Sequence, residues 1–177
     1  NYVELKNMLI ENNYNFYGDT DSEVIANLIE YNLLNIVVHV NNISHVDIEM
    51  AIENTCNQLD GTYSLIVSCK NFLDQIWITR KGSPLLLASN SELIIVTSEI
   101  GGFAGYINNY IVINNNNIFK INNSGYTVIN NTDKLFHRDI NVEDQEYDSF
   151  ISLNGYTYWM EKEIMDHVFT SGEAALN

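Results

Sequence analysis

The sequence predicts an α+β layered domain, in which helices come first and a run of antiparallel strands follows. Apolar residues recur at helical spacing up to Leu59, and after Gly61 short segments rich in β-branched and aromatic residues take over. Asn, Ser, Gly and Pro separate those segments at short intervals, as they do in turns. The 177 residues suffice for one domain, and 46% hydrophobic content can fill a core.

Three helices are expected in the first part of the chain, each with one apolar face that packs into the core. The first ends at Asn12-Asn13, and the third spans roughly Val46 to Leu59. The apolar faces comprise Val3, Leu5, Met8 and Leu9 in the first helix, Val24, Ile25, Leu28 and Ile29 in the second, and Ile48, Ala51, Ile52, Thr55 and Leu59 in the third.

Strands are expected throughout the middle of the chain. Their sequences are TYSLIVS, QIWITR, LLLA, LIIVTS, YIVI, IFKI and YTVI. Segments that are apolar throughout, such as LLLA, indicate a sheet covered on both faces. From about Thr132 to Asp148 this pattern ends in an acidic, aperiodic stretch, which we interpret as a linker or surface extension.

Charge excludes several classes of partner. Eight basic residues stand against 23 acidic ones, a net charge of −15. Such a surface repels phosphate backbones and anionic lipids, so we expect neither nucleic acid nor a membrane as partner. No apolar run approaches a membrane span, and Asn1 to Glu11 has no signal-peptide pattern. The few cysteines form no disulfide framework, which favours a reducing, cytoplasmic location.

The stretch GDTDSE, Gly18 to Glu23, concentrates acid and hydroxyl groups at the start of the second helix. Thr20 and Glu23 have the spacing of a capping box, and Asp19 or Asp21 could cap the helix as well. A carboxylate that does not cap could instead bind a cation. Both interpretations remain open on the residues alone.

The other reactive side chains favour structural roles. Cys56 lies within the apolar pattern of the third helix and is expected in the core, whereas Cys69 ends a strand and is expected as a surface or edge thiol. The histidines have no metal-ligand spacing, and we expect no metal site and a structural or solvent-facing place for His39, His45, His137 and His167.

Five segments, in order along nearly the whole chain, resemble one enzyme family. They are YNFYGDTDSEVIANLI, LDGTYSLIV, TRKGSPLLL, SELIIVTSEIGGFAGYINNYIVINNNNIFKI and YWMEKEI. They resemble segments of the glutamine–fructose-6-phosphate aminotransferases, also called glucosamine-6-phosphate synthases. A lone G-S-P-L would be weak evidence, but five ordered segments are specific. MEKEI separates this family from other amidotransferases that share its glutaminase fold.

The resemblance implies an N-terminal-nucleophile hydrolase fold, an αββα sandwich of antiparallel sheets, here incomplete at its N-terminus. Residues 1–130 would be the C-terminal part of the glutaminase domain, 131–157 an acidic linker, and 158–177 the beginning of the sugar isomerase domain. The chain opens at Asn1 without an initiator methionine, and we expect a fragment or a processed product.

The chemistry that the resemblance implies is hydrolysis of glutamine and transfer of ammonia to fructose 6-phosphate, giving glucosamine 6-phosphate. An N-terminal cysteine attacks the glutamine amide with its own α-amino group as base, and an Asn-Gly pair stabilises the oxyanion. No metal or organic cofactor takes part, and the parent enzyme is expected to be a homo-oligomer.

Asp21 matches the family's aspartate that binds the α-amino group of glutamine, and Thr20 beside it is a second candidate contact. No catalytic residue matches, because the nucleophilic cysteine and the oxyanion pair lie upstream of Asn1 in the family pattern. The chain alone is therefore expected to be inactive. Ser98-Glu99 replaces the family's S-D, and Asp166-His167-Val168 replaces E-Q-P, which weakens the match on the isomerase side.

Two alternatives remain. The chain could be a complete, diverged module without catalysis that uses the Asp21 pocket to sense an amino acid or bind a partner. It could also be the glutaminase part of another amidotransferase, with a different acceptor for ammonia; the MEKEI segment argues against this.

Overall fold

The structure, a computed structural model, describes residues 1–39, 42–103, 106–130, 135, 137–139, 153 and 155–165. Three helices come first, as the sequence predicts: α1 (Tyr2–Glu11), α2 (Asp21–Ile36) and α3 (His45–Gln58). The strands and one 3-10 helix follow, in the order β1 (Tyr63–Cys69), β2 (Phe72–Lys81), β3 (Leu86–Ser89), β4 (Ile94–Thr97), η2 (Ile100–Gly102), β5 (Asn109–Val112), β6 (Ile118–Asn122), β7 (Gly125–Val128) and β8 (His137–Asp139).

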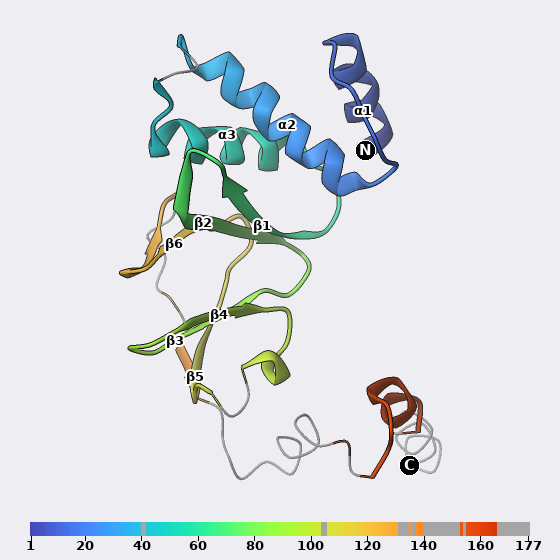
Figure 1. Ribbon diagram of the computed structural model, residues 1–177, viewed down its shortest axis with the longest axis vertical. Coiled ribbons are helices and arrows are strands. Elements are labelled where there is room, and N and C mark those ends of the chain that lie inside the picture. The colour runs from blue at the N-terminus through green and yellow to red at the C-terminus, as the bar shows by residue number, and fades with distance from the viewer. Residues whose placement is uncertain are drawn as a thin grey trace.

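The strands form two four-stranded antiparallel sheets, in the orders β1-β2-β6-β7 and β4-β3-β5-β8. Figure 1 shows α2 and α3 lying over the first sheet, with the second sheet on its other side. The α+β class and the antiparallel sheets predicted from the sequence are thereby confirmed. No helix in the described part of the chain is long and apolar enough to cross a membrane.

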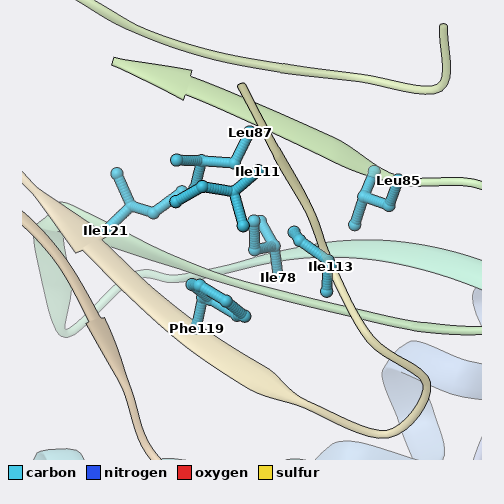
Figure 2. Packing of buried hydrophobic residues seen from close by; sticks show 7 residues of the cluster. All are labelled: Ile78, Leu85, Leu87, Ile111, Ile113, Phe119 and Ile121. Carbon is cyan, nitrogen blue, oxygen red and sulfur yellow. The ribbon is translucent and has the colours of Figure 1, made fainter. Parts of the chain in front are cut away.

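The main core lies between the two sheets. Alternate side chains of β2 and β6 point toward the second sheet and meet side chains from β3, β5 and the residues beside them. Figure 2 shows this cluster, which consists of Ile78, Leu85, Leu87, Ile111, Ile113, Phe119 and Ile121. Each such side chain, once buried, contributes about 1.5–3 kcal/mol of hydrophobic free energy.

A second core lies between the first sheet and the helices. Trp77 and Ile118 pack there against Leu33, Ile48 and Ile52. A buried polar network joins α2 to α3 beside it. The amide of Asn32 donates to Oγ1 of Thr55 at 3.0 Å, and Nε2 of Gln58 donates to Oδ1 of Asn32, also at 3.0 Å. These paired amides fix how the two helices face each other, because a shift would leave buried polar groups unpaired.

The outer face of the second sheet is also covered. Leu86 and Ala88 alternate with Leu87, which faces the main core, and pack against Phe103 and Ile107. This confirms that the apolar LLLA segment is buried on both faces. The αββα arrangement predicts a helical layer here, whereas among the described residues η2 and the turn after it supply the cover.

One strand, β8, was not predicted from the sequence. β8 lies within the stretch interpreted as a linker, yet it pairs with β5, with Arg138 opposite Tyr110. Farther along, residues 159–165 are helical, as expected for the tail. Most of the proposed linker and His167 lie outside the described residues, so the domain boundaries at residues 130 and 157 stay predictions.

Candidate functional site

The start of α2 shows which of the clustered acid and hydroxyl groups support the fold. Thr20 is the N-cap residue, with extended backbone angles (φ −100°, ψ 144°), and its Oγ1 accepts a hydrogen bond from the backbone N–H of Glu23 at 3.3 Å. This half of the expected capping box is present.

The other half of the predicted capping box, a contact from the Glu23 carboxylate to the Thr20 backbone, is wrong. The carboxylate of Glu23 reaches past Thr20 and accepts hydrogen bonds from the backbone N–H groups of Tyr17, at 2.8 Å, and Gly18, at 2.9 Å. Glu23 therefore fixes the loop before the helix rather than the N-cap residue itself. The spacing that indicates a capping box cannot distinguish these two sets of backbone donors.

Asp19 is also used structurally. Its Oδ1 lies 2.9 Å from Nζ of Lys6 on α1, which also donates to the carbonyl of Gly18 at 3.3 Å. Nζ of Lys6 lies 5.1 Å from the centre of the Phe16 ring, a cation–π distance. The role of Lys6 was not predicted, because no local sequence signal relates α1 to a loop more than ten residues away.

A shallow cavity of about 420 Å³ lies between α1 and this loop. Lys6, Tyr14 and Asp19 are among its lining residues. Asp21 is not among them, although it begins the next helix.

Asp21 differs from its acidic neighbours. It is the first residue of α2 and exposed, and among the described residues its carboxylate has no hydrogen-bond or ion-pair partner. The helix macrodipole favours negative charge in this first turn. The structure thus brings Asp19, Thr20, Asp21 and Glu23 together and leaves one carboxylate, that of Asp21, without a structural task.

The two cysteines lie on other elements, Cys56 on α3 and Cys69 on β1. Cys56 is half-buried in α3, where it packs against the helix–sheet core. Burial raises the pKa of its thiol, while the nearby hydroxyls of Tyr63 and Thr79 act weakly in the opposite direction. Both hydroxyls are buried and form no hydrogen bond among the described residues. Cys69 is half-buried at the end of the edge strand β1.

Among the described residues, no group of three or more His, Cys, Asp or Glu side chains could hold a metal ion. His45 has a structural role at the start of α3. Its ring contacts Phe72, with 4.0 Å between centroids, and its Nδ1 lies 2.7 Å from Nε2 of Gln75. His39 and His137 are exposed, as expected.

Comparison with known proteins identifies several relatives. No family model matches the sequence. Glutamine–fructose-6-phosphate aminotransferase (isomerizing) from Methanocaldococcus jannaschii is 31% identical over 169 residues, which is 94% of this chain and 15% of that protein. The enzyme of the same name from Buchnera aphidicola is 28% identical over 177 residues, 100% of this chain and 28% of that protein. The chain thus spans between 15% and 28% of the length of these two relatives.

A solved structure supports the fold. Glutamine phosphoribosylpyrophosphate amidotransferase from B. subtilis, in complex with ADP and GMP, superimposes with a TM-score of 0.58 at 19% identity. The match covers 75% of this chain and 27% of that one. The two proteins therefore share a fold over these residues.

Proposed function

Because this chain is homologous over most of its length to glutamine–fructose-6-phosphate aminotransferases, we propose that it forms the later part of the glutaminase domain of such an enzyme. The whole enzyme hydrolyses glutamine and passes the ammonia to fructose 6-phosphate, which gives glucosamine 6-phosphate. Residues 1–130 supply the glutaminase part, and the residues after 157 begin the isomerase part. The five ordered segments of the sequence support this proposal.

In this proposal Asp21 binds the α-amino group of glutamine. The observation that carries the assignment is that Thr20, Glu23 and Asp19 all have structural partners at this helix start, whereas the Asp21 carboxylate has none among the described residues. An ammonium on an exposed carboxylate contributes about 1 kcal/mol or less, and about 1–3 kcal/mol once the pair is desolvated.

Thr20 is the second contact in this proposal. Its Oγ1 already accepts a hydrogen bond from Glu23, so the hydroxyl proton is what it can offer to a substrate oxygen. Replacement of Thr20 therefore changes both the helix cap and the proposed contact, which makes Asp21 the sharper residue to test.

The nucleophile is not among these residues. The proposed chemistry needs a cysteine whose own α-amino group is the base. Cys56 lies within α3 and Cys69 within β1, so neither can present such an amine. We expect a polypeptide limited to these 177 residues to show no glutamine hydrolysis.

The test uses the longest natural polypeptide that contains these residues, assayed for glutamine hydrolysis and for glucosamine 6-phosphate. Asp21→Ala should raise the KM for glutamine about tenfold or more, because substrate binding loses an ion pair. Asp19→Ala, the matched control two residues away, should leave that KM unchanged, because Asp19 pairs with Lys6.

An unchanged glutamine KM in Asp21→Ala would show that this carboxylate serves only the helix. Glutamine binding without any turnover in that polypeptide would support the diverged, non-catalytic module instead. Ammonia release without transfer to fructose 6-phosphate would support an amidotransferase with another acceptor.

A further inference from the structure

A cleft of about 870 Å³ opens at one end of the sandwich, between the two sheets. It is bounded by the start of β2, the β3–β4 turn and the β6–β7 turn. The first turn of α2 lies near the opposite end of the first sheet, because Val24 packs with Leu59 and Tyr63 at the start of β1. The cleft is therefore separate from Asp21, and a ligand site in it is independent of the proposed function.

The floor of the cleft is apolar. Ile76, Ile94 and Tyr126 line it and pack against the main core, to which Ile121 belongs. The cleft is thus the open end of the core between the sheets. Its volume lies in the range of small-molecule sites, and its floor can bury the apolar body of a ligand.

Two carboxylates stand at the rim, one from each sheet. Asp74 lies near the start of β2 and lines the cleft together with Ile76. Glu92 lies in the β3–β4 turn, where Oδ1 of Asn90 accepts hydrogen bonds from the backbone N–H groups of Glu92, at 2.8 Å, and Leu93, at 2.9 Å. That turn holds Glu92 at the rim before any ligand arrives.

The charge at the rim has one sign. No lysine, arginine or histidine lines the cleft, and the carboxylates of Asp74 and Glu92 have no hydrogen-bond or ion-pair partner among the described residues. The remaining polar lining residues are neutral asparagine, serine and glutamine side chains. With the chain at −15 overall, the potential here repels anions and attracts cations.

We propose that this cleft binds a small amphipathic cation. The apolar body of the ligand lies on Ile76, Ile121 and Tyr126, and its ammonium or amidinium group lies between Asp74 and Glu92. The cleft thus prefers a ligand with both an apolar body and a positive charge. A neutral ligand of the same shape loses the ion pairs, and a small inorganic cation makes no apolar contact with the floor.

The test compares benzamidine with benzamide, its neutral isostere, by titration of the ¹⁵N-labelled 177-residue chain and observation of backbone amide shifts. Benzamidine should shift the amides of residues 74–76, 90–94 and 122–126. Benzamide should shift the same amides but bind about ninefold more weakly, as expected for the loss of two partly exposed ion pairs worth about threefold each.

Variants separate a site from general attraction to an acidic chain. Asp74→Asn and Glu92→Gln should each weaken benzamidine binding about threefold, and the double variant should reduce it to the level of benzamide. Glu53→Gln, on the exposed side of α3, makes the same change in net charge and should leave binding unaltered. The dispersion of the amide spectrum shows directly that each variant is folded.

Three results would overturn the proposal. The first is equal affinity for benzamidine and benzamide, and the second is a set of shifted amides outside the cleft. The third is a loss of affinity in Glu53→Gln as large as that in Asp74→Asn.

Discussion

Lys120 on β6 reaches across the helix-facing side of the first sheet to Glu49 on α3, with 2.8 Å between Nζ and Oε1. The same carboxylate oxygen accepts a hydrogen bond from Nε1 of Trp77 at 3.4 Å. The side chains of Glu49 and Lys120 are only 11% and 24% exposed. One carboxylate thus serves both a buried indole and an ammonium at the interface between helix and sheet.

Replacement of Lys120 by Met should destabilise the protein by about 1–3 kcal/mol, because the Glu49 carboxylate would stay at the interface without its cation. Urea unfolding followed by circular dichroism measures this change. Asp19→Asn, which breaks an ion pair whose carboxylate is 99% exposed, should cost less than about 1 kcal/mol. Equal effects of the two variants would show that burial of the Glu49–Lys120 pair is immaterial.

At the start of α2, Thr20 should contribute more to the stability of the fold than Asp21, the proposed substrate-binding residue. Thr20→Ala removes the N-cap acceptor and should lower the free energy of unfolding by about 1 kcal/mol. Asp21→Asn removes only a charge near the helix end and should cost about 0.5 kcal/mol or less. Thermal and urea unfolding of the two variants measure both. If Asp21→Asn costs as much as Thr20→Ala, Asp21 has a structural task.

Acid should weaken the capping box of α3. The Ser44 hydroxyl, and after it the Ser44 backbone N–H, hold the pKa of the Asp47 carboxyl below its ordinary value of 3.8. Since this pKa is lower in the folded chain than in the unfolded one, the stabilisation is complete above about pH 4 and is lost as the pH falls through the folded value.

The measurement for Asp47 is the melting temperature of Asp47→Asn against the original chain. At about pH 6 the variant should melt lower, and by about pH 2 the difference should shrink toward zero. A difference that stays constant over this range would mean that the Asp47 charge does not contribute.

The thiol of Cys56 should be poorly reactive. Burial raises its pKa, and the thiolate is the reactive form. In the Cys69→Ser variant, which leaves Cys56 as the sole thiol, reaction with Ellman's reagent at about pH 8 should be at least about tenfold slower in the folded chain than in urea. Equal rates would show that the packing around Cys56 opens readily.

The sequence predicted those elements whose residues carry a strong local period. The apolar face of α3 and the alternation in β1 fix both elements, since each buries a regular set of side chains. Pairing between distant strands has no such signal. β8 is too short to show alternation, and its partner β5 lies more than twenty residues earlier, so it was missed.

At the candidate site, too, local interactions were predicted from the sequence and long-range ones were not. Thr20 was predicted as a cap because the interaction spans three residues. The partner of Asp19 was not predicted, because Lys6 meets it only after α1 has packed beside α2. The apolar floor and acidic rim of the cleft likewise come from the start of β2 and two separate turns, which only the folded sheets bring together.

The pairing of β8 with β5 has a practical consequence for expression. A polypeptide cut at residue 130 would retain every strand of the first sheet but leave one edge of β5 with open backbone donors and acceptors. Such an edge recruits strands from other molecules, so a shortened product should precipitate more readily than one that extends past Asp139. The position at which the polypeptide ends on its C-terminal side should therefore affect its solubility.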